Sequence, residues 1–242
     1  MKKIKYKNTL ITSSNKQKII KNLFNDVSEK YDIMNDFMSL GLHRFWKKSL
    51  LKNLKNESPK TILDLAGGTG DIAKGMSKLF SNSNILVYDL SLEMMLKSKS
   101  NCSKAQNIFY INGDAENLAI KDNSVDLITL SFGLRNFSNL EKSIQECYRV
   151  LKSGKRIYCL EFSPSFNNCI KPFYDFYSSK VIPQIGKKIA KNVEAYEYLV
   201  SSIRNFPHNH ELKNIFTKKG FFCYNQEKYF GGIAYLNIFS KI

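Results

Sequence analysis

The chain has 242 residues, of which 43% are hydrophobic and 24% charged, and its formal net charge is +16 at pH 7. This length suits one α/β domain with embellishments and is too short for two nucleotide-binding halves plus a substrate domain. No apolar run approaches the roughly 18 residues that a bilayer-spanning segment needs, which excludes a membrane-spanning protein and leaves a soluble or peripheral one.

The positive charge leaves three interpretations open: nucleic acid, an anionic membrane surface, or no specific partner. Most of the cations are Lys, which favours a residue bias spread over the surface and makes the few arginines more informative. Arginine occurs only at positions 44, 135, 149, 156 and 204.

The five cysteines are odd in number and include no C-x-x-C pair, which argues against a disulfide framework and a zinc site and fits a reducing compartment. Residues 1–25 hold seven Lys and no acid but lack an apolar core with a cleavage site, so we expect no secretory signal. We expect a cytoplasmic protein, peripheral on the inner membrane. The mitochondrial matrix face is the alternative, because the basic N-terminus also fits a presequence.

The N-terminal region divides into a tail and a cap. Residues 1–20 are polar and basic, and we expect a flexible tail there. Residues 21–56 are expected to form a helical cap, because apolar residues recur at helical spacing and Gly41 suggests a break between two helices. The stretch from Tyr31 to Trp46, YDIMNDFMSLGLHRFW, lies inside this cap. It is either a helical stretch of ordinary core residues or one wall of a substrate site.

After Pro59 the pattern alternates between strands and helices. Strands are expected within residues 61–68, 84–90, 107–113, 124–132 and 155–163, and helices within 71–80, 91–99 and 140–152. Ser91 is the expected N-cap of the second of these helices, and Gly154 is expected to stop the third. This order predicts a parallel sheet with helices on both faces.

The C-terminal third begins with an aromatic and basic insert at residues 164–191. It suits a greasy substrate tail and a membrane surface, or alternatively a helix packed on the sheet edge. Helices are expected at 193–204 and at 209–219, the second ended by Gly220, followed by a hairpin around Gly231-Gly232. With its cap and insert, the segment 21–242 is expected to be a single domain.

The most specific motif is LDLAGGTGD, residues 63–71, where a strand turns into a helix through Gly67, Gly68 and Gly70. Such a turn lets backbone approach a ligand closely. Gly68-x-Gly70-x-x-Ala73 also satisfies the dinucleotide fingerprint, and Asp89 ends the next strand, where it is placed for ribose hydroxyls. NAD and S-adenosylmethionine both present an adenosine ribose to such a loop.

Three features favour S-adenosylmethionine over NAD. Asp64 and Asp71 flank the loop, and their carboxylates would repel a pyrophosphate but attract an ammonium and a sulfonium. Asp114 and the backbone N–H of Ala115 follow the third strand, where they can bind the adenine amino group and a ring nitrogen. The C-terminal hairpin suits a methyltransferase sheet better than a second dinucleotide-binding half. The alternative is that these acids merely cap helices.

Three segments resemble the ubiquinone/menaquinone biosynthesis C-methyltransferases of the UbiE type. They are YDIMNDFMSLGLHRFW, LDLAGGTGD, and SFGLRNF followed by RVLKSGKRIYCLEFS, and the resemblance extends over nearly the whole chain from about Phe24. The chain departs from the family at Ser153-Gly154-Lys155, where the family has Pro-Gly-Gly. The resemblance implies a class I S-adenosylmethionine-dependent methyltransferase fold, Rossmann-like, with a mostly parallel seven-stranded sheet and an antiparallel last strand.

The same resemblance implies methyl transfer to a ring carbon of a polyprenylated quinol, either a 2-polyprenyl-6-methoxy-1,4-benzoquinol or a demethylmenaquinol. Family cofactor contacts map onto Thr69, Asp89, Asp114, Ala115 and Ser131. Of these, Ser131 rests mainly on the resemblance. In-line attack on a sulfonium methyl group requires no metal, so we expect none.

The reaction needs help in removing a phenolic proton, and Arg135 and Asn136 at the site rim are the candidates. Their structural alternatives are a salt bridge for Arg135 and a helix N-cap for Asn136. His43, which titrates near neutral pH, is a second candidate base or a satisfied structural histidine. Tyr31 is expected either to hydrogen-bond the substrate or the cofactor, or to pack in the core.

We expect a polyprenylated quinol as partner, with a membrane surface, other quinone-biosynthesis enzymes and a second copy of the chain as further candidates, and no nucleic acid. Three rival functions stay open: an RNA or DNA methyltransferase, an NAD-dependent reductase, and a non-catalytic member of a quinone-synthesis assembly. Against the first, the chain lacks both the N-P-P-[YF] motif of amino-methylating enzymes and a Pro-Cys nucleophile motif.

Overall fold

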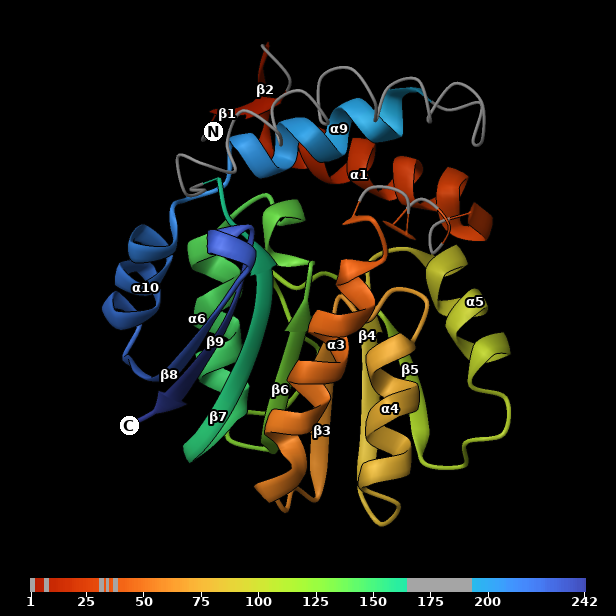
Figure 1. The fold of residues 1–242 in the computed structure, drawn as a ribbon, viewed down its shortest axis with the longest axis vertical. Coiled ribbons are helices and arrows are strands. Elements are labelled where there is room, and N and C mark those ends of the chain that lie inside the picture. The colour runs from red at the N-terminus through yellow and green to blue at the C-terminus, as the bar shows by residue number, and fades with distance from the viewer. Residues whose placement is uncertain (1–2, 7–8, 31–32, 34, 37–38, 165–192) are drawn as a thin grey trace.

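A seven-stranded sheet forms the centre of the computed structural model, which describes residues 3–6, 9–30, 33, 35–36, 39–164 and 193–242 (Figure 1). The strand order is β5-β4-β3-β6-β7-β9-β8. Strands β3 to β7 pair in parallel, and β9 runs antiparallel to both of its neighbours. The strands are β3 (Thr61–Leu65), β4 (Asn84–Asp89), β5 (Ile108–Asn112), β6 (Val125–Ser131), β7 (Leu151–Phe162), β8 (Phe221–Tyr229) and β9 (Ala234–Lys241).

Helices cover both faces of this sheet. They are α3 (Leu42–Asn53), α4 (Asp71–Leu79), α5 (Leu92–Asn101), α6 (Leu140–Val150) and α10 (Asn209–Lys218). The helix α9 (Val193–Arg204) lies above the upper end of the sheet in Figure 1. The single 3-10 turns are η1 (Ser28–Lys30), η2 (Leu54–Asn56), η3 (Leu134–Asn136) and η6 (Phe230–Gly232). The predicted α/β fold with a mostly parallel sheet and an antiparallel last strand is therefore confirmed.

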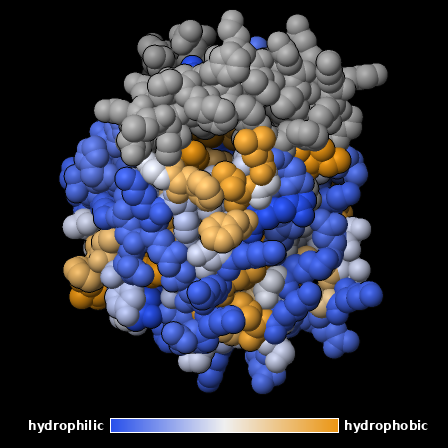
Figure 2. Space-filling view, in the orientation of Figure 1, coloured by the Kyte–Doolittle hydropathy of each residue, from blue (hydrophilic) through white to orange (hydrophobic). Residues whose placement is uncertain are grey.

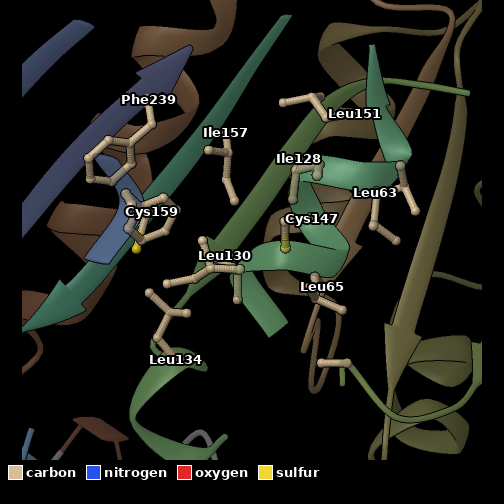
Figure 3. Packing of buried hydrophobic residues seen from close by; sticks show 14 of the residues in the cluster. Leu63, Leu65, Ile128, Leu130, Leu134, Cys147, Leu151, Ile157, Cys159 and Phe239 are labelled. Atoms are coloured by element: carbon tan, nitrogen blue, oxygen red, sulfur yellow. The ribbon is translucent and has the colours of Figure 1, made fainter. Parts of the chain in front are cut away.

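Alternating side chains of the central strands build a core on each face. Leu63 and Leu65 of β3 pack with Cys147 of α6 and Phe239 of β9 (Figure 3), whereas Ile62 faces the α3 and α4 side. This alternation follows from the two-residue period of a strand, and truncating a buried leucine of such a core costs about 2–5 kcal/mol.

The boundaries agree with the sequence except at one junction. Ser91 caps α5 as expected, since its Oγ accepts a hydrogen bond from the Met94 N–H at 3.1 Å. The expectation that α6 stops near Gly154 is wrong: the helix ends at Val150, and β7 already begins at Leu151. Leu151 pairs with Val125 of β6, so tertiary strand pairing overrides the helical pattern of the sequence there.

Regular structure also begins earlier than the sequence indicated. Within the segment expected to be a flexible tail, β1 (Lys3–Tyr6) pairs with β2 (Thr9–Thr12), and α1 (Ser13–Val27) follows. The helix α1 lies across the upper end of the sheet in Figure 1 and contacts α5. Burial of Ile20 and Leu23 accounts for this docking. The domain boundary at residue 21 and the mobility of the tail stay predictions.

The insert expected at 164–191 lies outside the described residues except for Pro164. In the described part of the chain, no helix is both long and apolar enough to cross a membrane.

Candidate cofactor site and active site

A cavity of about 740 Å³ opens at the carboxyl ends of β3, β4, β5 and β6. This edge is where open parallel sheets bind their ligands. The cavity wall includes, among others, Gly68, Asp89, Asp114, Ala115, Ser131 and Asn136, together with Gln17 and Phe24 of α1. The structure therefore brings together most of the predicted site residues.

The glycine loop is held close to the end of β4. The Gly68 N–H donates to Asp89 Oδ2 at 2.9 Å, at a φ of +54° that favours glycine. A Cβ added at Gly67 would lie 2.9 Å from Val87 Cγ1 and 3.0 Å from Asp64 Oδ2. Glycine is required there because the loop backbone packs directly against β4 and the Asp64 carboxyl.

Asp89 occupies the position expected for a ribose-binding carboxylate. Its Oδ1 accepts from the Ser91 N–H at 2.9 Å, which fixes the side chain at the cavity wall. Burial raises the pKa of Asp89, although the hydrogen bonds from Ser91 and Gly68 oppose this shift.

Asp114 and Ala115 lie at the end of β5. Asp114 Oδ1 accepts from the Glu116 N–H at 2.9 Å, and both Asp114 and Ala115 line the cavity. This is the placement that the sequence predicted for an adenine-binding pair.

A second cavity of about 380 Å³ adjoins the glycine loop and is lined by Asp64, Gly67, Thr69, Asp71 and Ser131, among others. Asp64 Oδ1 accepts from Thr129 Oγ1 at 2.7 Å, whereas Oδ2 is buried and has no hydrogen-bond partner among the described residues. The buried Ser131 Oγ also lacks one within that part of the chain. A buried acceptor and a buried hydroxyl, both lacking partners, fit a ligand that brings an ammonium group, as S-adenosylmethionine does.

The charges beside the loop differ from the simple expectation of two ionised acids. Burial raises the pKa of Asp64 to about 7, so near neutral pH this side chain is only partly ionised and repels a pyrophosphate less than expected. Asp71 is also buried in part, but Lys47, whose Nζ lies 2.9 Å from Asp71 Oδ2, overcomes that effect and holds the pKa of Asp71 below its usual value.

Arg135 lies behind the cavity wall. Its Nη1 is 2.8 Å from Glu161 Oε1, both side chains are only 2% exposed, and the same Nη1 donates to the Phe132 carbonyl oxygen. The expectation that Arg135 lies at the rim is therefore wrong, because Glu161 at the end of β7 holds it inside in a salt bridge. A catalytic role for Arg135 stays a prediction.

Asn136, in contrast, lines the large cavity. Its Oδ1 accepts a hydrogen bond from the Tyr198 hydroxyl of α9 at 3.0 Å. The alternative role as a helix N-cap is wrong, because Asn139 caps α6 by accepting from the Lys142 N–H.

His43 does not have the properties of a base near neutral pH. Burial lowers its pKa to about 4, and its Nδ1 lies 2.7 Å from Ser39 Oγ. It is not among the described residues that line either cavity. The geometry matches the alternative of a satisfied structural histidine. Tyr31 lies outside the described residues.

The sequence did not predict that α1 and several aromatic residues take part in forming the cavities. Gln17, Ile20 and Phe24 of α1 line the large cavity. The apolar spacing of Ile20, Leu23 and Phe24 was the available signal, but nothing local indicated what that face covers. Phe132 lines both cavities. Its ring is backed by those of Phe162 and Trp46, whose centroids lie 4.6 Å and 6.1 Å away and which are not among the described residues lining either cavity. We call the Phe132 ring with this backing the aromatic wall.

Comparisons with known proteins agree with this architecture. A crystal structure of a SAM-dependent methyltransferase from Aquifex aeolicus superposes with a TM-score of 0.59 at 16% identity, covering 81% of this chain and 89% of that one. A crystal structure of the cyclase SpnF superposes with a TM-score of 0.67 at 13% identity, covering 95% and 96%. These likenesses show the fold alone, and a fold does not fix a reaction.

Sequence comparison is more specific. The chain is 41% identical over 234 residues to the ubiquinone/menaquinone biosynthesis C-methyltransferase UbiE of Rickettsia prowazekii, covering 94% of each chain. The family model described as the ubiE/COQ5 methyltransferase family matches residues 11–241. The choice between NAD and S-adenosylmethionine is thereby decided in favour of an S-adenosylmethionine-dependent methyltransferase. Because the match covers residues 11–241, from α1 to β9, and includes every described residue that lines the two cavities, this chain belongs to the ubiE/COQ5 methyltransferase family.

Proposed function

We propose that this protein methylates a ring carbon of a polyprenylated quinol in ubiquinone or menaquinone biosynthesis. The substrate class comes from the name of the Rickettsia prowazekii relative, and the aromatic wall beside the cofactor cavity is the structural observation that carries it. The candidate substrates are a 2-polyprenyl-6-methoxy-1,4-benzoquinol and a demethylmenaquinol.

The residues at the strand ends would hold S-adenosylmethionine, which when bound supplies an electrophilic methyl group on a sulfonium. Asp89 accepts from the ribose hydroxyls, and Asp114 with the Ala115 N–H binds adenine. Asp64 Oδ2 accepts from the ammonium group. A cation beside the Asp64 carboxyl favours its ionised form and lowers a pKa that burial has raised.

Phe132 gives both cavities an apolar aromatic surface, which suits a planar ring with a hydrocarbon tail. Phe132 faces both cavities and packs on Phe162 and Trp46, so a quinol ring at this wall would gain ring contacts and exclude water.

Methylation would form one carbon–carbon bond and break the bond between sulfur and the methyl carbon, whose electron pair stays on sulfur. The ring carbon gives up its proton as the ring becomes aromatic again, and one proton is released to water overall. Ionisation of the neighbouring phenol makes that carbon nucleophilic. Asn136 Nδ2 donates to the phenolic oxygen, while Oδ1 is held by the Tyr198 hydroxyl. Arg135 holds the backbone of Phe132 in place by donating a hydrogen bond to the Phe132 carbonyl oxygen.

The exposed apolar side chains support contact with a lipid surface. Leu40, Phe45 and Phe230 are 63%, 58% and 51% exposed, and Phe45 and Phe230 flank the buried Trp46–Tyr229 ring pair. Figure 2 shows hydrophobic residues just below the atoms drawn in grey, with further ones scattered among mostly hydrophilic residues at the left and lower down. We therefore propose a peripheral protein at the cytoplasmic face of the inner membrane, where its lipid substrate resides.

The test is incubation with labelled S-adenosylmethionine and each reduced quinol separately, followed by mass analysis of the extracted lipid. We expect label in at least one quinol and its loss when Asn136 is replaced by Ala. A non-catalytic member of a quinone-synthesis assembly predicts intact cofactor binding and label in neither quinol. Label in RNA would instead favour the nucleic-acid alternative.

A further inference from the structure

The helix α1 forms a roof over the cofactor cavity and is held there by two adjacent polar side chains. Lys16 Nζ donates to the Phe137 carbonyl oxygen at 2.8 Å, and Gln17 Nε2 donates to Asp114 Oδ2 at 2.9 Å. Farther along the same helix, Asn25 Oδ1 accepts from the Ser91 hydroxyl at 2.7 Å. These contacts join α1 to residues that follow three different strands of the sheet.

Gln17 differs from Lys16 and Asn25 because it combines two properties. It lines the cavity, and it bonds to the same carboxylate that is placed to bind the adenine amino group. Lys16 has neither property among the described contacts: it bonds a backbone carbonyl, and it is not one of the described residues lining the cavity. Burial lowers the pKa of Lys16 to about 8, with Glu116 opposing the shift.

We propose that Gln17 is a specificity residue that reads the 6-amino group of adenine together with Asp114. This inference rests on the proposed placement of adenine at Asp114 and Ala115.

The hydrogen-bonding capacity of the two side chains supports this role. Asp114 Oδ1 already accepts from the Glu116 N–H, which orients the carboxylate, and Oδ2 accepts from Gln17, which lines the cavity together with Asp114. A carboxylate oxygen can accept two hydrogen bonds, so Oδ2 can hold Gln17 Nε2 and one amino hydrogen of adenine together.

The amide orientation then follows from chemistry. A carboxylate only accepts, so the nitrogen end of the Gln17 amide must face Asp114, and the carbonyl oxygen Oε1 is the other end. An acceptor at that end complements the second hydrogen of an amino group. A purine without the amino group offers nothing to either residue.

The experiment measures dissociation constants by calorimetry for S-adenosylhomocysteine and for an analogue in which hydrogen replaces the 6-amino group. The variants are Gln17→Leu and, as a matched control on the same roof, Lys16→Met. We expect Gln17→Leu to weaken S-adenosylhomocysteine binding about 5- to 10-fold while changing the affinity of the analogue less than about 2-fold. We expect Lys16→Met to change both affinities by the same factor, because it loosens the roof without touching the base.

Equal weakening of both ligands by Gln17→Leu, or no weakening of either, would overturn the proposal, since a residue that only docks the roof cannot distinguish the bases. Asp114→Ala separates this outcome from an error in the placement of adenine. If S-adenosylhomocysteine binds Asp114→Ala as tightly as the unaltered protein, the placement itself is wrong. If Asp114→Ala weakens binding and Gln17→Leu does not, only the role of Gln17 is refuted.

Discussion

Replacing Glu161 by Gln tests the buried pair behind the cavity wall. Glu161 accepts from Arg135 Nη1 at 2.8 Å, from the Arg135 N–H at 3.3 Å and from the Phe162 N–H at 2.9 Å. Both side chains of the pair are 2% exposed, so water screens their interaction little. Glutamine has nearly the same shape but leaves the guanidinium facing a neutral group, and breaking such a buried pair costs about 3–5 kcal/mol of unfolding free energy.

The assay is urea denaturation, with the free energy of unfolding extrapolated to water. The matched control is Glu29→Gln, which makes the same chemical change in a surface pair between Lys97 and Glu29, where Glu29 is 81% exposed. Such pairs contribute about 0–1 kcal/mol. If Glu161→Gln lowers the free energy of unfolding no more than Glu29→Gln does, burial does not strengthen the Arg135–Glu161 pair.

Three further predictions concern the site. Burial raises the pKa of Asp64 from 3.8 to about 7, so the unfolded chain loses this proton at lower pH than the folded one, and the free energy of unfolding falls as pH rises between these values. Asp64→Asn should remove this fall in urea titrations at several pH values. An unchanged dependence of stability on pH in this variant would contradict the raised pKa. Burial lowers the pKa of His43 from 6.5 to about 4, so the free energy of unfolding falls as pH drops through that range. His43→Asn should lessen this loss and leave the pH profile of turnover between about pH 6 and 8 unaltered. A shifted profile would instead indicate that His43 acts as a base. Asn136→Ala should lower kcat about 100-fold while S-adenosylhomocysteine affinity stays within about 2-fold, and equal losses in both would make Asn136 a cofactor residue instead.

The strand-ending motifs were predictable because their signals are local. Glycines at a strand-to-helix turn, and acids such as Asp89 and Asp114 just past apolar runs, fall at one sheet edge whenever the strands are parallel. Ser91 is equally local, since an N-cap lies one residue before its helix.

The surroundings of the site were not predictable, because they depend on contacts between distant parts of the chain. Arg135 and Glu161 are 26 residues apart and meet only because β6 and β7 are neighbours. Gln17 and Asp114 are 97 residues apart in the sequence but form a hydrogen bond, and no local pattern indicates which surface α1 covers. The pKa of His43 is likewise set by burial, which a sequence indicates only as an average tendency.

Methyl transfer to a ring carbon is tested by locating the methyl group in the product. The protein is incubated with S-adenosylmethionine carrying a trideuterated methyl group and a reduced quinol, and the purified product is examined by mass spectrometry and deuterium NMR. We expect a trideuterated methyl group on a ring carbon. A label on a quinol oxygen, or no label in either candidate quinol, would contradict it.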